Sequence, residues 1–192
     1  MLIIQSTSAN LSGATISNIQ ALAEQVICYS KDMEYMPDRS DLLRLPATLL
    51  PSASLQLAFL PRTNQHMQDF LYTLANQKGF TIESNQSYLE PQLLWLQSGG
   101  ISTREDRLTF TVILPRPRGV NDETPEPLSK GFIERPIGQG QFVRSSFQCR
   151  VGDIIILEGG ERIWVPREDN IEPCGVCLLY QSVAISRHPT GL

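Results

Sequence analysis

The clearest alternation of hydrophobic and polar positions lies near the C-terminus, over residues 151–166. Two stretches rich in β-branched and aromatic residues flank the pair Gly159-Gly160. Glycine can adopt the positive φ values that two-residue hairpin loops require, so this pattern predicts a β-hairpin. Apolar or alternating runs predict further strands at residues 2–5, 54–60, 80–83, 93–97, 108–114, 141–150 and 177–185. In 108–114 a side of threonine and isoleucine alternates with a purely apolar side, which is typical of a half-buried strand.

Two helices are predicted in the N-terminal half, where apolar positions recur every three or four residues. The first covers residues 16–27, and the second begins after Thr63 and ends at Gly79, a residue typical of the C′ position. Contiguous strands follow these helices, which favours an α+β fold over a doubly wound sheet. We expect two N-terminal helices packed on a mixed or antiparallel sheet, and a β-rich C-terminal part that could close into a small barrel.

Proline divides the chain into three parts. Residues 1–114 are expected to form the α+β core, and residues 137–192 a β-rich part that continues it. Between them, residues 115–136 contain five prolines and few core-forming side chains. A long segment of this kind is predicted to be an extended arm or loop, because such segments in compact domains are usually functional or flexible.

Composition limits the function classes. Hydrophobic residues make up 41% of the 192 residues, so the chain can bury a core. The formal charge of −4 argues against general electrostatic attraction to nucleic acid. The sequence has no apolar run long enough to cross a bilayer and no secretory signal pattern. We therefore expect a location in the cytoplasm or within an assembled particle, away from membranes, with reduced cysteines.

Residue types that carry catalysis are scarce. Histidine, the usual acid–base and metal-binding side chain, occurs only at His66 and His188. No zinc-protease, nucleophile-elbow, P-loop or dinucleotide motif is present. The sequence therefore predicts a protein that is not an enzyme and holds no cofactor.

Cys174 and Cys177 have the spacing of redox and metal motifs. A redox pair normally opens a helix, whereas a strand is predicted to follow this one. A zinc site would need two further ligands, which Cys28 and Cys149 could supply. Ordinary apolar packing is the favoured interpretation, so no metal site is predicted and the pair is kept only as a weak candidate.

Between Arg107 and Arg150 basic side chains outnumber acidic ones by seven to four, and phenylalanines lie among them. Arginine with aromatic residues is typical of protein-interface hot spots and of single-strand nucleic-acid binders. Solvated arginines around core phenylalanines would give the same composition. The candidate partner-binding residues are Arg116, Arg118, Lys130, Phe132, Arg135, Phe142 and Arg144.

These observations favour a non-catalytic, adaptor-like subunit that contacts other protein chains through the 115–136 arm, as a homo- or hetero-oligomer. Components of phage-like and virus-like particles have a similar build. The alternative is a protein that binds RNA or single-stranded DNA through residues 107–150. Steep loss of affinity with rising salt would distinguish the alternative from protein contact.

Overall fold

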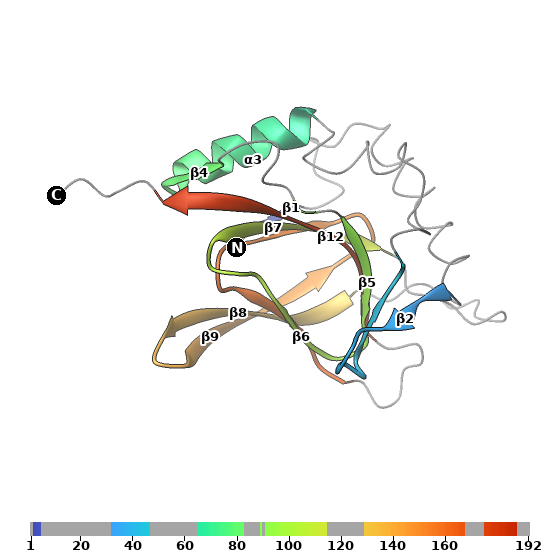
Figure 1. Cartoon of the computed structure of the whole chain (residues 1–192). Coiled ribbons are helices and arrows are strands. Elements are labelled where there is room, and N and C mark those ends of the chain that lie inside the picture. Colours follow the sequence, from blue (N-terminus) through green and yellow to red (C-terminus); the bar gives the residue numbers. More distant parts are fainter. Residues whose placement is uncertain are drawn as a thin grey trace.

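Two antiparallel β-sheets stacked face to face form the body of the protein in the computed structural model (Figure 1). The residues that the structure describes are 2–4, 32–46, 65–82, 89, 91–114, 129–167 and 175–187. The large sheet has eight strands and the small sheet has four.

The large sheet has the strand order β1-β10-β7-β12-β5-β3-β2, and β4 also pairs with β12. Its strands are β1 (Leu2–Ile4), β10 (Ile154–Leu157), β7 (Arg107–Leu114), β12 (Val176–Arg187), β5 (Gln92–Leu96), β3 (Leu42–Arg44), β2 (Glu34–Tyr35) and β4 (Phe80–Ile82). The small sheet has the order β6-β11-β8-β9. Its strands are β6 (Gly99–Ser102), β11 (Arg162–Val165), β8 (Ser129–Gly138) and β9 (Gln141–Cys149).

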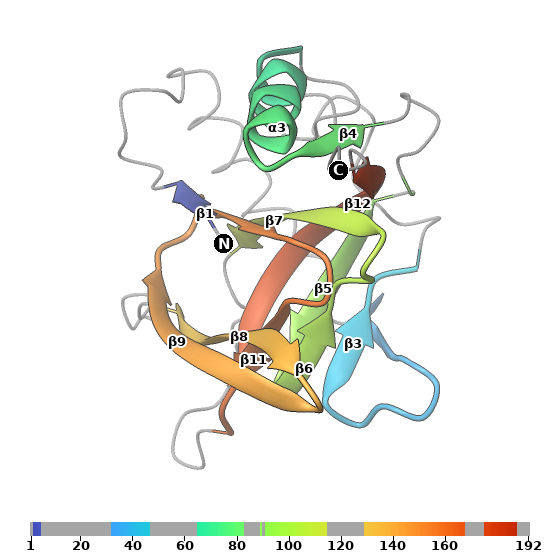
Figure 2. The ribbon, with the colours of Figure 1, turned by 90° about the vertical axis from the view of Figure 1, so that its left-hand side faces the viewer.

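Helix α3 (Gln65–Gln77) covers one face of the large sheet, and the small sheet lies on the other (Figure 2). Met67, Leu71 and Ala75 are spaced four residues apart, so they share one side of the helix and are buried against the sheet. The helix ends at Gln77, and Gly79 follows it with φ +75°, which agrees with the predicted glycine after the helix. The second predicted helix is therefore confirmed.

A separate hydrophobic core fills the space between the two sheets. The large sheet contributes Leu94, Ile113 and Leu178, and the small sheet contributes Ile133 and Phe147. Side chains alternate between the two faces of a strand, so neighbouring positions on β7 and β12 belong to the helix-side core.

The prediction of an α+β fold with two N-terminal helices on a sheet is wrong. The described part of the chain is mostly strand, has one helix, and has two antiparallel sheets that do not close into a barrel. Strands β10 and β12, from the β-rich C-terminal part, lie on either side of β7 within the large sheet. The first predicted helix, 16–27, and the predicted strand 54–60 lie outside the described residues.

The predicted hairpin over residues 151–166 is also wrong, although both of its strands exist. β10 pairs with β1 and β7 in the large sheet, whereas β11 pairs with β6 and β8 in the small sheet. The glycine turn between them carries the chain from one sheet to the other. A Cβ on Gly159 would lie 2.2 Å from the carbonyl oxygen of Glu105, so this turn is pressed against the β6–β7 connection.

Part of the expected arm is ordinary sheet. Residues 129–136 lie in β8, where they pair with β9 on one side and β11 on the other. Residues 115–128 lie outside the described residues.

Strand β7 also differs from its prediction, because Thr109 and Thr111 on its polar side are fully buried between the sheets. No helix in the described ranges has both the length and the hydrophobicity that crossing a bilayer would demand.

Close packing inside the small sheet can be tested at Gly131. A Cβ there would lie 2.6 Å from the carbonyl oxygen of Trp164 and 2.8 Å from the ring of Phe147. We expect Gly131→Ala to lower the free energy of unfolding by about 1–3 kcal/mol, because this backbone and ring have little room to move. Urea denaturation measures the change. Gln148→Ala, at an exposed position of the same hairpin, should stay within about 0.5 kcal/mol of the wild type.

Candidate protein-interaction site

The outer face of the small sheet carries a cluster of arginine, aromatic and glutamate side chains. Ile133, Phe147 and Ile163 point to the inter-sheet core, so their neighbours along the strands point outward. The cross-strand register places Arg162 opposite Glu134 and Glu134 opposite Arg144. We call this surface the arginine–aromatic face; it consists of Phe132, Glu134, Phe142, Arg144, Arg162 and Trp164.

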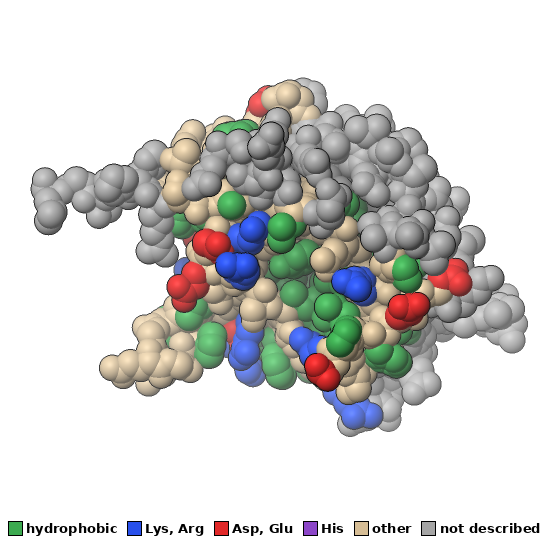
Figure 3. Space-filling model, viewed as in Figure 1, with side chains coloured by type: hydrophobic (Ala, Val, Ile, Leu, Met, Phe, Trp, Pro, Cys, Tyr) green, Lys and Arg blue, Asp and Glu red, His purple; other side chains and the backbone are tan. Residues whose placement is uncertain are grey.

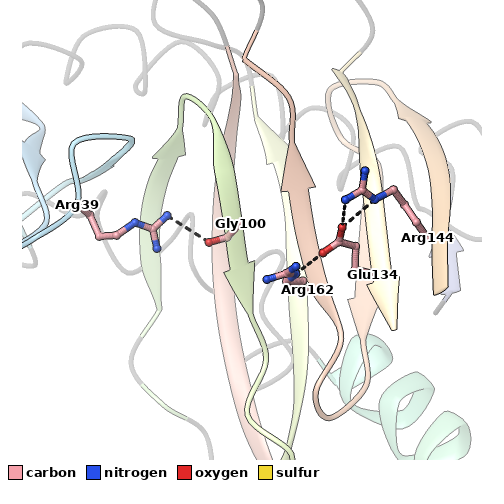
Figure 4. Close-up of polar contacts among 5 residues, drawn as sticks. All are labelled: Arg39, Gly100, Glu134, Arg144 and Arg162. Carbon is pink, nitrogen blue, oxygen red and sulfur yellow. Dashed lines mark hydrogen bonds and ion pairs between the residues drawn. The ribbon is translucent and has the colours of Figure 1, made fainter. Parts of the chain in front are cut away.

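Glu134 lies at the centre of this face and receives hydrogen bonds from two arginines (Figure 4). Its Oε1 accepts from Nε of Arg144 at 2.8 Å and also from Nη2, and its Oε2 accepts from Nε of Arg162. The Glu134 side chain is only 2% exposed, compared with 54% for Arg144 and 30% for Arg162. The two guanidinium groups thus shield the carboxylate from solvent.

Two opposing effects act on the pKa of Glu134. Burial on its own raises this pKa, but the hydrogen bonds from Arg144 and Arg162 outweigh burial and hold the pKa below its ordinary value. Glu134 is therefore ionised at neutral pH and fixes both guanidinium groups in place.

The same two guanidinium groups lie over aromatic rings. Arg144 lies 5.1 Å from the ring centroid of Phe132, and Arg162 lies 4.5 Å from Phe142 and 5.3 Å from Trp164. These are cation–π distances, each worth about 0.5–1 kcal/mol at an exposed site. The interactions hold side chains from β8, β9 and β11 in one layer.

The β6 end of the small sheet is tied to the large sheet by Arg39. Its Nε and Nη2 donate to the carboxylate of Asp41 at 2.7 and 2.6 Å. Nη2 also donates to the Gly100 carbonyl oxygen at 3.2 Å (Figure 4). The Arg39 hydrogen bond lowers the pKa of Asp41. A Cβ on Gly100 would come within 3.0 Å of the Trp164 ring, so glycine at this position lets the indole lie against β6.

The structure brings together only some of the predicted partner-binding residues. Phe132, Phe142 and Arg144 belong to the arginine–aromatic face, and Lys130 lies on the same side of β8. Arg135 lies on the opposite side, where its Nε donates to Oε1 of the buried Glu161 at 2.8 Å. Arg116 and Arg118 lie outside the described residues.

Sequence reasoning missed Glu134, Arg162 and Trp164. A usable signal was present in residues 162–165, where polar or aromatic positions alternate with Ile163 and Val165. That alternation assigns Arg162 and Trp164 to one face, but it does not show which strand lies beside them.

The cysteine candidates are not brought into a described metal site. Cys177 is buried in the helix-side core, and Cys174 lies outside the described residues. Cys149 is buried too, and burial together with the charge of Asp153 raises the pKa of its thiol to about 12. Within the described ranges, no three histidine, cysteine or acidic side chains gather as a metal site would require.

No model of a known protein family and no curated protein matches this sequence. Similarity appears among solved structures. The non-heme alpha ketoglutarate dependent epimerase SnoN from nogalamycin biosynthesis aligns with 100% of this chain and 79% of its own, at 10% identity and a TM-score of 0.56. The chain shares the fold of an enzyme. At this identity the likeness shows the fold alone.

This likeness corrects the expectation that the chain is not an enzyme, because an enzyme is built on the same fold over the full length of the chain. The small number of histidines was therefore a poor basis for predicting that the chain is not an enzyme. The described residues of this chain do not supply a metal-binding set like the one that a non-heme metal reaction needs.

Two further solved structures, a vicilin and a 7S globulin, give weaker matches. Vicilin from hazelnut (Corylus avellana) aligns with 77% of this chain at 11% identity and a TM-score of 0.34. The 7S globulin of Momordica charantia aligns with 80% at 9% identity and the same TM-score. The chain spans about a third of the length of either protein, 30% and 33%.

Removing the central carboxylate tests the arginine–aromatic face. We expect Glu134→Gln to lower the free energy of unfolding by about 1–3 kcal/mol at neutral pH, because the carboxylate charge that strengthens the three hydrogen bonds from Arg144 and Arg162 is lost. The folded-state pKa of Glu134 is depressed, so its contribution is present at neutral pH and is lost as pH falls through that pKa. The difference between variant and wild type should therefore shrink below about pH 4.

Urea denaturation at neutral pH and at about pH 3 measures both quantities. Glu105→Gln, which neutralises an exposed carboxylate, is the control and should change stability by less than about 0.5 kcal/mol. Equal stability of Glu134→Gln and wild type at neutral pH would show that the two arginines do not depend on Glu134.

The raised pKa of Cys149 predicts an inert thiol. At pH 8 the thiolate, which is the reactive form, should be on the order of a thousandfold scarcer than in an unfolded chain. Brief treatment with iodoacetamide followed by peptide mass spectrometry should find Cys149 unlabelled in the native protein and labelled in urea. Rapid native labelling would contradict the burial of this residue.

Proposed function

We propose that the chain is a protein-interaction subunit that assembles with further copies of itself through the β8–β9 hairpin. The observation that carries this proposal is the outer edge of β9. In the described small sheet β9 is the terminal strand, so it has a partner, β8, on one side only. Its opposite edge presents main-chain N–H and C=O groups to another strand.

Strand β9 has little that would prevent strand addition. It is nine residues long, has a single charged residue, Arg144, and contains no proline. Residues 141–146 are all exposed. Edge strands in monomeric proteins are usually short or are protected by inward-pointing charges and proline. A long edge without these features is typical of one that pairs with another chain.

The sequence of β9 suits pairing with a second copy of itself. An antiparallel pair centred on Ser145 would place Val143 opposite Phe147 and Arg144 opposite Ser146. Apolar side chains would then meet on the inner side, and the two arginines would not oppose each other. Val143 is 50% exposed in the single chain, so pairing would remove apolar surface from water.

The arginine–aromatic face lies beside this edge and adds to the same interface. Arginine, tryptophan and other aromatic residues are the types enriched at interface hot spots. Here the ion pairs with Glu134 fix Arg144 and Arg162 before any partner arrives, which lowers the conformational entropy lost on binding. Phe142, at 43% exposure, extends this surface toward the hairpin tip, which stands away from the large sheet (Figure 1).

Nucleic-acid binding through the same residues is less well supported. Stacking on bases needs open aromatic faces. The rings of Phe132, Phe142 and Trp164 have guanidinium groups over them, and Glu134 neutralises part of the arginine charge. The acidic chain as a whole would also repel phosphates.

A charge placed on the β9 edge tests the proposal. We expect wild-type protein to sediment as a dimer or larger species at micromolar concentration, and Val143→Lys to sediment as a monomer. Residue 143 is half exposed in the single chain, so the substitution should change the free energy of unfolding of the monomer by less than about 0.5 kcal/mol. Sedimentation velocity measures the association.

The matched control is Ile137→Lys, which adds the same charge at a position that is 57% exposed on the inner strand of the hairpin. This variant should still associate. A monomeric wild type, or equal loss of association in both variants, would rule out pairing through β9. Retention of an oligonucleotide at low salt by the wild type would favour the nucleic-acid alternative.

A further inference from the structure

The face of the large sheet that looks toward the small sheet changes from apolar to polar along its strands. At one end Ile113 of β7 and Leu178 of β12 pack in the inter-sheet core. Side chains two residues apart share a face, so the following inward positions can be read from these two. They are polar: Thr109, Thr111, Tyr180 and Ser182.

Two of these hydroxyl groups satisfy each other. Thr109 and Ser182 are opposite each other in the register, and their hydroxyl oxygens lie 2.8 Å apart. Thr111 differs from Thr109, although both are 0% exposed on the same side of the same strand. Within the described residues the Thr111 hydroxyl has no hydrogen-bond partner. A buried hydroxyl without a hydrogen-bond partner lowers the stability of the folded protein, so its presence calls for an explanation.

A second buried hydroxyl without a described partner belongs to Thr103. Thr103 follows β6 and is held by main-chain hydrogen bonds to Gly160 and Glu161. By alternation from Ile101, which packs on the inter-sheet core, it is on the inward side of the small sheet. Both sheets therefore direct an unsatisfied hydroxyl toward the layer between them.

Thr111 belongs to a polar row that crosses three strands. Tyr180 lies opposite Thr111 on one side and opposite Gln92 on the other. Hydroxyl groups both donate and accept hydrogen bonds, and the glutamine amide does the same through two different atoms. The row contains no carboxylate, ammonium or guanidinium group.

The row reaches the surface at one side of the molecule. Gln92 and Tyr180 are only partly buried, as are Ile101 and Met36, which pack on the same inter-sheet core. In the view of Figure 3, hydrophobic side chains gather in the middle of the molecule, with basic side chains beside them. The partial exposure of Gln92 and Tyr180 means that this end of the row is in contact with solvent.

We infer that the row Gln92–Tyr180–Thr111 is a binding site for a small neutral molecule rich in hydroxyl groups, such as a monosaccharide or a cyclic polyol. Each ligand hydroxyl both donates and accepts, which matches the hydroxyl and amide groups of the row. Ile101 and Ile163, across the inter-sheet layer, offer an apolar surface to the C–H face of such a ring. Few precisely placed polar groups among apolar ones are typical of ligand sites. This site is separate from the β8–β9 hairpin.

The stability of two matched variants tests whether the Thr111 hydroxyl is reserved for a ligand. Thr111→Val removes a hydroxyl that no described residue satisfies, so the melting temperature should stay equal to that of the wild type or rise. Thr109→Val removes the partner of Ser182 and should lower it. If both variants lose stability alike, Thr111 has a structural partner and the inference fails.

Binding is measured by saturation-transfer-difference NMR with D-glucose, D-xylose and myo-inositol as probes. At least one probe should give a signal with the wild type, and its affinity should fall roughly five- to tenfold in Thr111→Val, the worth of one hydrogen bond. Ser102→Ala, which removes an exposed hydroxyl on the outward side of β6, should bind as the wild type does. Absence of any signal, or equal binding by Thr111→Val, would mean that the row holds water only.

Discussion

Burial of the large sheet on both faces is the constraint on which the rest of the structure depends. Helix α3 and the helix-side core cover one face, and the small sheet covers the other. Strands β7, β10 and β12 therefore lie between two layers, where nearly every position must be apolar or hydrogen-bonded. The few polar side chains on the inward face stand out against this rule. Thr109 and Ser182 obey it by bonding to each other, whereas Thr111 does not, and this contrast is the physical basis of the proposed ligand site.

The small sheet has the opposite situation, because only its inner face packs against another described layer. On its outer face, the rings of Phe132, Phe142 and Trp164 are covered by neighbouring side chains of the same sheet. Glu134 positions Arg144 and Arg162 through hydrogen bonds, and these two arginines lie over the three rings. This layer is orderly but remains partly exposed, and beside it β9 ends the sheet with an unshared edge. The same asymmetry thus gives a polar row between the sheets and an open arginine–aromatic surface outside them.

The sequence predicted which residue types the candidate interaction site contains, but not which residues come together to form it. Residues 107–150 showed arginine and phenylalanine in proximity, and Phe132, Phe142 and Arg144 do form part of one surface. Arg135 was assigned with them, yet it is one position out of phase with Glu134 and lies on the other face, paired with Glu161. Arg162 and Trp164 come from a strand about 30 residues further along the chain, which only the pairing of β11 with β8 brings alongside. The expectation that the chain is not an enzyme failed for a related reason: residue counts describe neither fold nor site.

By itself, the sequence determined local structure: where helix α3 begins and ends, where most described strands lie, and that Gly159-Gly160 is a turn. These features depend on side-chain periodicity and on backbone freedom within a few residues. Tertiary structure alone decided which strands become neighbours. The segments on either side of Gly159-Gly160 look like partners, yet they enter different sheets. β10 pairs with β1 and β7 in the large sheet, where both of its faces are buried, whereas β11 pairs with β6 and β8 in the small sheet. Pairing follows from the total apolar area that the whole chain can bury, and no short stretch of sequence contains that information.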